Sequence, residues 1–308
     1  MRISISSFIT LAIAASGIAA QPSKRLVSVN PPPSQNARVD LKALPPVDVT
    51  PITNAKRFSQ GLPPLSPVKR KPHRGGPHRD GGYHHVGTPV EFAPRAQTSS
   101  SPAVTVKCNI LVKTSGGSSL GYMSPVFNDY GEYGTPQSSQ TGALEVSFPN
   151  TATSGSAAGP LDLLATNNAD TINSFPYLSA AIGFMSDGDD LGPGNANYVV
   201  ITGNSGSTGS GSTPSSSTGN SYVTRTGMSA NSETTVWTYD PATQDIRVVW
   251  TNTDGSSVPT NLIYFVDTDP SDGDANTLVA AGDVAAFRGL FGCTDTCPEV
   301  TLTCVPPA

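Results

Sequence analysis

Short apolar stretches, separated by clusters of turn-forming residues, dominate the last two thirds of the chain. Their β-branched and aromatic residues often alternate with polar ones, which indicates half-buried strands. The clearest stretch places Ile246, Val248 and Trp250 on one face, directly after a good type I turn at 240–243. Strands are predicted at 103–113, 143–148, 178–185, 197–202, 221–226, 233–239, 246–251, 261–266 and 300–305.

One stretch, 282–291, has a helical pattern instead. Asp283 is suited to cap it, and its apolar stripe contains Val284, Phe287, Leu290 and Phe291. Many antiparallel strands with a single short C-terminal helix predict an all-β fold of the β-sandwich or jelly-roll kind. Residues 102–308 are long enough for one such domain.

The first 101 residues have a different character. They hold 13 Lys and Arg against 4 Asp and Glu, whereas residues 102–308 hold 5 against 19. Residues 1–20, with Arg2 before an apolar run and small residues at the end, predict a secretory signal peptide. The proline-rich stretch 21–101 has almost no apolar periodicity and is predicted to be a disordered basic leader, or propeptide. A basic leader therefore precedes an acidic domain.

Basic pairs punctuate this leader at Lys24-Arg25, Lys56-Arg57 and Lys69-Arg70-Lys71. An exposed chain with paired positive charges suits a kexin-like processing protease. The candidate processing positions are Arg25, Arg57, Arg70, Lys71 and the single basic residue Arg95. We expect the secreted protein to begin after Arg57, Arg70, Lys71 or Arg95.

All four cysteines lie in the acidic domain, and a secretory route makes disulfides the default. We favour Cys108–Cys304, which joins the first strand to the last, and Cys293–Cys297, which closes a small loop. The other two pairings, and a zinc site made of cysteines alone, are the alternatives. The stretch 204–221 contains only Asn, Ser, Gly, Thr and Pro, and is predicted to be a flexible loop. It serves either as a plain spacer or as a carrier of O-linked sugar.

The composition excludes several kinds of chemistry. All four histidines (His73, His78, His84 and His85) lie in the leader, so the acidic domain has neither a Ser-His-Asp triad nor a histidine-ligated metal. The leader histidines lack an ordered scaffold, so loose metal binding there is only a minor alternative. There is no phosphate-binding glycine loop, and no cofactor is expected. The negative charge of the domain disfavours nucleic acid and anionic membranes as partners.

Carboxylates are the remaining reactive groups. The loop 187–190 and the run containing Asp267, Asp269, Asp272 and Asp274 are rich in the oxygen ligands that calcium prefers. The second run fails the EF-hand register, however, and solvated turns are the simpler interpretation of both. Two carboxylates that lie close together in space could instead catalyse glycoside hydrolysis or acid proteolysis. The candidates that look least like turn residues are Glu132, Glu145 and Glu233, followed by Glu299.

Aromatic residues suggest a binding surface. Trp237 and Trp250 continue strand faces and are expected in the core. Tyr122, Tyr130 and Tyr133 lie in a segment that mixes aromatic, polar and glycine residues. That mixture is typical of carbohydrate-binding surfaces, so these three tyrosines are the candidate glycan-binding residues.

Several short motifs resemble a group of secreted, functionally uncharacterised proteins of basidiomycete fungi. They are Gly121-Tyr122 with Tyr130-Gly131, the run 236–241, the run 250–255, and Gly282-Asp283-Val284 with Phe287. The resemblance covers residues from about 102 onward and implies export from a fungus, with no activity attached. Fungal glutamic peptidases share only the general architecture of a basic propeptide before an acidic β domain.

Two functions follow as hypotheses. The first is a secreted, non-catalytic β-sandwich protein of the cell wall or extracellular matrix that binds wall polysaccharide. The second is a secreted hydrolase, a glycosidase or acid peptidase, made as a precursor whose basic leader masks a carboxylate site.

Overall fold

The computed structural model describes residues 28–49, 104–150, 157–167, 173–268, 271, 273, 275–294 and 296–308. The predicted signal peptide (1–20) lies outside these residues. So do all five candidate processing positions, Arg25, Arg57, Arg70, Lys71 and Arg95. Both predictions therefore stay predictions.

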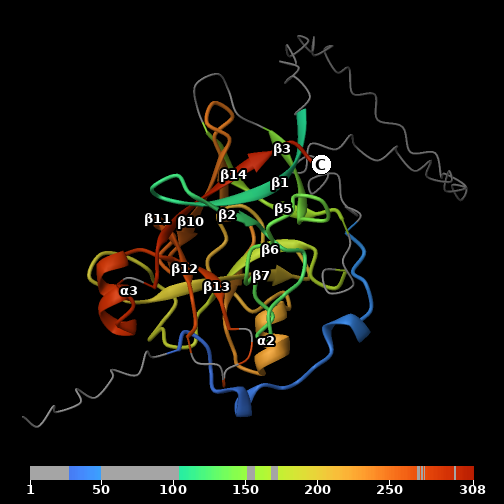
Figure 1. Cartoon of the computed structure of the whole chain (residues 1–308). Coiled ribbons are helices and arrows are strands. Elements are labelled where there is room, and N and C mark those ends of the chain that lie inside the picture. Colours follow the sequence, from blue (N-terminus) through green and yellow to red (C-terminus); the bar gives the residue numbers. More distant parts are fainter. Residues whose placement is uncertain are drawn as a thin grey trace, which may run out of the picture.

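Most of the regular secondary structure of the described chain is strand, as Figure 1 shows. The strands are β1 (Val104–Thr114), β2 (Ser119–Tyr122), β3 (Glu145–Asn150), β4 (Ala158–Leu161), β5 (Leu163–Ala165), β6 (Tyr177–Ile182), β7 (Tyr198–Asn204), β8 (Ser232–Glu233), β9 (Trp237–Tyr239), β10 (Asp245–Thr251), β11 (Ser257–Pro259), β12 (Asn261–Phe265), β13 (Thr277–Ala281) and β14 (Glu299–Val305). The helices are the short 3-10 turns η1 (Pro33–Gln35) and η2 (Leu41–Ala43), and the α-helices α2 (Ser221–Thr226) and α3 (Val284–Phe291).

Eight antiparallel strands close into a barrel. The ring runs β1, β3, β5, β6, β7, β13, β12, β14 and back to β1. Closure occurs at β1, where Asn109 pairs with Glu145 of β3 on one edge and with Val305 of β14 on the other. The predicted all-β antiparallel fold is confirmed. The sandwich or jelly-roll form is a correction, because closing the ring leaves one continuous sheet where a sandwich has two.

The barrel interior is the main core. Every strand of the ring contributes alternate residues to one apolar cluster, for example Ile110 from β1, Leu178 from β6 and Leu302 from β14. Trp237 and Trp250 belong to the same cluster and are fully buried, which confirms the sequence-based placement. Each indole N–H donates to a backbone carbonyl, so burying these polar groups costs little.

A second apolar cluster covers the outer face of β7, β12 and β13. Helix α3 packs here, with Phe287 and Phe291 each edge-on to Tyr198 at ring-centroid separations of 5.4 and 5.3 Å. The predicted cap is present, since the Asp283 carboxylate accepts from the Ala286 N–H at 2.9 Å. The outer face of these three strands is therefore buried, like the inner face.

Two disulfides join the favoured cysteine pairs, Cys108–Cys304 and Cys293–Cys297. The first links β1 to β14 beside the closure of the barrel. The second lies just after α3.

The segment 221–226 is a helix, although its Tyr-Val-Thr composition predicted a strand. Its two ends explain the difference. The Asn220 side chain accepts from the Val223 N–H at 2.7 Å at the start, and Gly227 adopts a left-handed conformation at the end. The capping residues outweigh the strand propensity of the residues between them.

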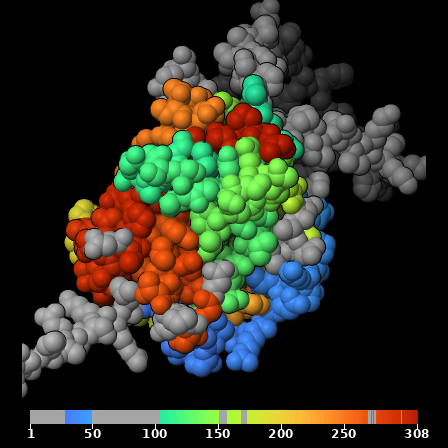
Figure 2. Space-filling model, viewed as in Figure 1, coloured from blue at the N-terminus to red at the C-terminus, as the bar shows by residue number. Residues whose placement is uncertain are grey.

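Residues 28–49 pack on the barrel, although they lie within the stretch predicted to be disordered. Figure 2 shows this segment, here called the strap, in blue across the lower surface of the molecule. Val29 and Leu41 are buried in the two apolar clusters. The prediction of disorder is therefore wrong for this part of the leader. The strap has no core of its own, and it orders by contributing side chains to the core of the barrel.

Candidate functional site

A polar cleft of about 410 Å³ opens between the β6–β7 loop and α2. We call it the α2 cleft. One wall is the segment 182–189, the second is 216–223, and the third is 228–231. The first segment is distant in sequence from the other two, and the pairing of β6 with both β7 and β8 brings them together.

The β6–β7 loop is held in place by Asn197. Its side-chain oxygen accepts from the Asp187 N–H at 2.9 Å, and its amide donates to the carbonyls of Gly188 and Asp190 at 3.3 and 3.0 Å. These bonds replace strand pairing for a loop that turns away from the sheet. The acidic stretch 187–190 is thus a structured loop along the rim of the cleft.

The Asp189 carboxylate crosses the α2 cleft to Asn231. The Asn231 side-chain amide donates to Asp189 Oδ2 at 2.7 Å, and the Asp189 carbonyl accepts from the Trp250 indole at 2.8 Å. Asp189 is therefore positioned from both its backbone and its side chain. A carboxylate beside an amide, each with further hydrogen-bonding capacity, can bind a ligand rich in hydroxyl groups.

The wall formed by α2 adds an aromatic ring and hydroxyls. Tyr222 lines the cleft and is almost fully buried, and burial raises its pKa well above the ordinary value. Phe184 is half-buried on the facing loop. The Thr218 hydroxyl oxygen is buried and makes no hydrogen bond within the described part of the chain. The cleft thus combines apolar ring surface with hydroxyl, amide and carboxylate groups.

The loop 204–221, predicted to be flexible, is ordered in the structure. Thr208 exchanges hydrogen bonds with Thr234, and the Asn204 amide donates to the Ser232 hydroxyl at 2.9 Å. Its hydroxyls satisfy neighbouring backbone and side-chain groups, which fixes the chain without an apolar core. O-linked sugar on this loop stays a prediction.

Acidic residues also line two other clefts. A cleft of about 540 Å³ lies where β10 and β12 diverge along β14, and Asp240, Asp245, Arg247 and Glu299 are among its lining residues. The Arg247 guanidinium pairs with the Asp245 carboxylate at 3.2 Å. A third cleft, of about 180 Å³, contains Asp162, whose carboxylate accepts from the Ser207 and Thr235 hydroxyls.

The candidate glycan-binding tyrosines are not exposed together. Tyr130 and Tyr133 are buried, and only Tyr122 is half-exposed. The cause is that their segment fills a split between β7 and β13. The Tyr133 N–H donates to the Ile201 carbonyl at 2.8 Å, and its carbonyl accepts from the Leu278 N–H at 3.1 Å. The prediction that Tyr130 and Tyr133 offer rings to a ligand is therefore wrong for this structure.

The candidate catalytic glutamates do not share a site. Glu132 is buried and accepts from Asn30 and Asn128 at 3.1 and 2.9 Å. Glu233 is buried elsewhere and accepts from the Thr251 N–H at 3.3 Å. Desolvation raises the pKa of Glu233 to about 8.

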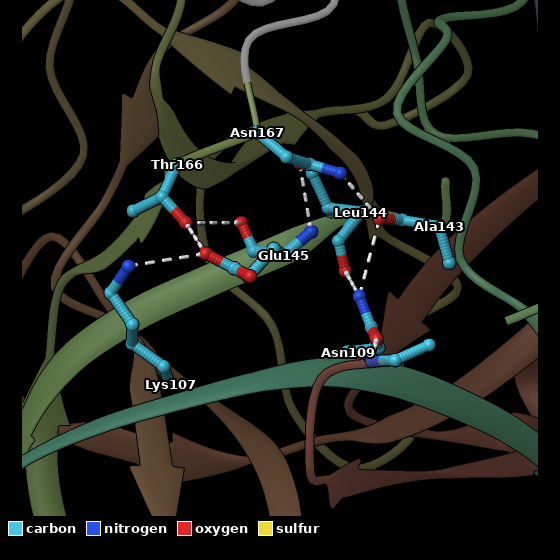
Figure 3. Close-up of polar contacts among 8 residues, drawn as sticks. Lys107, Asn109, Ala143, Leu144, Glu145, Thr166 and Asn167 are labelled. Carbon is cyan, nitrogen blue, oxygen red and sulfur yellow. Dashed lines mark hydrogen bonds and ion pairs between the residues drawn. The ribbon is translucent and has the colours of Figure 1, made fainter. Parts of the chain in front are cut away.

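Glu145 and Glu299 lie in ion pairs. Figure 3 shows Glu145 between the Thr166 hydroxyl, at 2.5 Å, and the Lys107 ammonium, at 3.3 Å. Thr166 first, and then Lys107, lower the pKa of Glu145. Glu299 pairs with Arg288 at 3.3 Å. Each of the four glutamates thus has its own partners, and Glu299 alone of the four is among the residues that line the three clefts.

The predicted calcium ligands are described only at Asp267, which accepts from the Ser28 hydroxyl at 3.3 Å. Asp269, Asp272 and Asp274 lie outside the described residues. Within the described ranges no group of three or more His, Cys, Asp or Glu is placed to hold a metal ion. Calcium binding at 267–274 stays a prediction.

Comparison with known proteins yields no relative. No family model, no curated protein and no solved structure matches the chain. Among the helices of the described residues, none is long and apolar enough to span a membrane.

Sequence reasoning missed the residues that build the α2 cleft. Asn231 follows a helix that was predicted as a strand, and Thr218 lies in a stretch predicted as spacer. The one available signal was the density of side-chain oxygens and amides in 187–190 and 204–221, two stretches that both contribute lining residues to the cleft.

Proposed function

We propose that this chain is a secreted, non-catalytic protein of the cell wall or extracellular matrix, and that it binds glycan in the α2 cleft. The observation that carries the proposal is the lining of that cleft. It offers the carboxylate and amide of Asp189 and Asn231, the hydroxyl of the exposed Ser229, and the ring surface of Phe184. Sugars present hydroxyls at their edges and C–H groups on their faces, so such a mixture of groups suits them.

Secretion is supported by the two disulfides, since such bonds persist in oxidising compartments. The predicted signal peptide at 1–20 agrees with this. The acidic charge of the domain favours neutral or cationic wall polymers over anionic ones.

The hydrolase alternative has weaker support. A two-carboxylate mechanism needs both acids beside the same bond, typically with about 5–10 Å between them. Glu132 and Glu233 instead belong to separate sets of buried hydrogen bonds, while Glu145 and Glu299 are held in ion pairs.

The test is binding of the purified full chain to soluble oligosaccharides of fungal and plant walls, measured by calorimetry after a glycan-array screen. We expect Asp189→Asn and Asn231→Ala each to weaken oligosaccharide binding about tenfold to a hundredfold. Each variant removes the charge-assisted hydrogen bond between Asp189 and Asn231, and with it one group that would bond to a sugar hydroxyl. Asp245→Asn is the matched control, since it neutralises one carboxylate in the second cleft.

The control variant should bind as tightly as the unaltered chain. Loss of binding in Asp245→Asn, with Asp189→Asn unaffected, would move the site to the second cleft. No binding to any oligosaccharide at millimolar concentration would refute the glycan proposal.

A further inference from the structure

The strap is attached to the barrel like a core element. Val29 is fully buried, Asn30 and Leu41 are 2% and 4% exposed, and Pro31 is also buried. Val29 packs in the outer apolar cluster, whereas Leu41 packs in the cluster that fills the barrel. The strap is thus anchored at two places, with extended chain and the 3-10 turn η1 between them.

Polar contacts at the first anchor are specific. The Tyr198 hydroxyl donates to the Val29 carbonyl, and the Asn30 amide donates to the Glu132 carboxylate at 3.1 Å. The Ser28 hydroxyl donates to Asp267 at 3.3 Å. Glu132 is completely buried, and its hydrogen bond from Asn30 replaces part of the solvation that it would have in water.

The rest of the strap is held through its backbone. Arg225 of α2 donates to the Val39 carbonyl, and its own carbonyl accepts from the Ala37 N–H at 3.0 Å. Farther along, the Ser174 hydroxyl donates to the Pro45 carbonyl at 2.7 Å, and the Val47 N–H donates to the Asn173 carbonyl at 2.9 Å. These bonds extend over the whole described length of the strap.

The basic pairs lie on both sides of this segment. Lys24-Arg25 precedes it, and Lys56-Arg57 and Lys69-Arg70-Lys71 follow it. Hydrolysis after Arg25 and after Arg57, each consuming one water and leaving a new carboxylate and a new ammonium group, would release residues 26–57 from the chain but would cut no contact described above.

We propose that residues 28–49 stay bound to the barrel after cleavage on either side, as a non-covalent peptide subunit. The segment that covers this part of β7, α2 and residues 173–174 is therefore the chain's own leader. The strap is not a propeptide that is discarded on maturation, and a mature protein that begins after Arg57, Arg70, Lys71 or Arg95 would still carry it.

The experiment uses the full chain with the recognition sequence of a site-specific protease inserted after residue 70. The chain is folded, cut and passed through gel filtration in native buffer at about 10 μM and again after hundredfold dilution. Fractions are analysed by mass spectrometry and circular dichroism. We expect the N-terminal fragment to co-elute with the barrel at both concentrations and to separate from it only in denaturant.

Anchor variants connect retention to the strap. Val29→Asp with Leu41→Asp places a charge at each anchor, and we expect at least a hundredfold weaker retention of the cut fragment. Lys42→Ala, at an exposed position next to the second anchor, is the matched control and should leave retention unchanged.

Two results would overturn the proposal. One is release of the fragment from the cut, otherwise unaltered chain while circular dichroism shows an intact barrel. The other is equal retention in the double anchor variant, because binding would then not depend on the strap. Since the first result needs no substitution, the test does not depend on whether the double variant folds.

Discussion

Glu233 should make the stability of this protein depend on pH in an unusual direction. The residue is 1% exposed, and one of its carboxyl oxygens accepts from the Thr251 N–H at 3.3 Å. Its other carboxyl oxygen is buried and has no hydrogen-bond partner among the described residues. Desolvation therefore raises the pKa of Glu233 from 4.5 to about 8.

The sign follows from proton binding. Below pH 4.5 the carboxyl is protonated in both the folded and the unfolded chain, and it has no effect on their balance. Between pH 4.5 and about 8 the unfolded chain loses the proton while the folded chain keeps it, so the free energy of unfolding falls as pH rises. The displaced pKa corresponds to at most about 5 kcal/mol. Relaxation around a buried charge reduces such penalties, so we expect a loss of about 2–4 kcal/mol by pH 9.

The assay is urea unfolding of the unaltered chain, of Glu233→Gln and of Glu145→Gln at pH 3, 4.5, 7 and 9. The neutral glutamine cannot ionise, so its stability should change less with pH, and it should exceed that of the unaltered chain by about 2–4 kcal/mol at pH 9. Glu145→Gln is the control with the opposite sign. The lowered pKa of Glu145 means that its contribution is lost only as pH falls below 4.5. Parallel pH profiles for the unaltered chain and Glu233→Gln would refute the reasoning.

Two further predictions test the fold, one on the disulfides and one on a glycine. Replacing the Cys108–Cys304 pair by alanines should lower the free energy of unfolding in urea by about 5 kcal/mol, and replacing the Cys293–Cys297 pair by about 2 kcal/mol. In the chain-entropy model the stabilisation by a disulfide grows with the sequence separation of its cysteines, which is 196 for the first pair and 4 for the second. Equal losses would contradict this reasoning. Gly183→Ala would place a methyl carbon 2.1 Å from a tyrosine ring carbon at the start of β7, so we expect about 1–3 kcal/mol lower stability and a lower melting temperature.

Local patterns predicted local structure well. The alternation of Ile246, Val248 and Trp250 marks β10, whose inward residues are these three. Asp283 before an apolar stripe marks α3. In both elements the residues that decide the structure are neighbours in the sequence, so a period of two or a capping residue is sufficient evidence.

Strands that are buried on both faces were not predicted from local patterns. β13 (Thr277–Ala281) is buried at every residue, since the barrel core covers one face and the outer apolar cluster the other. Its sequence therefore has no alternation, and no strand was predicted there. Closure of the barrel was not predicted for a different reason. The two residues that pair with Asn109 lie 36 and 196 positions later in the chain, so no local pattern indicates the pairing.

Exposure was the property that the sequence predicted least well. The segment around Tyr130 mixes rings, polar groups and glycines, and this mixture serves both a binding surface and a tight insertion between strands. Gly131 illustrates the second use, since a Cβ there would lie 2.4 Å from the Ser221 carbonyl oxygen. Composition cannot separate the two uses, because the difference lies in whether β7 and β13 diverge.

The short helix α2 connects the strap to the α2 cleft. Six residues are too few for a helix to be stable alone, so contacts with its neighbours must hold it. On one side Arg225 bonds to the strap at Val39, and on the other Tyr222 and Val223 line the cleft. A strap that dissociated would therefore remove support from one wall of the α2 cleft. If both proposals hold, weakening the strap anchors should also weaken glycan binding, although no anchor residue lines the cleft, and calorimetry on the Val29→Asp, Leu41→Asp double variant measures that coupling directly.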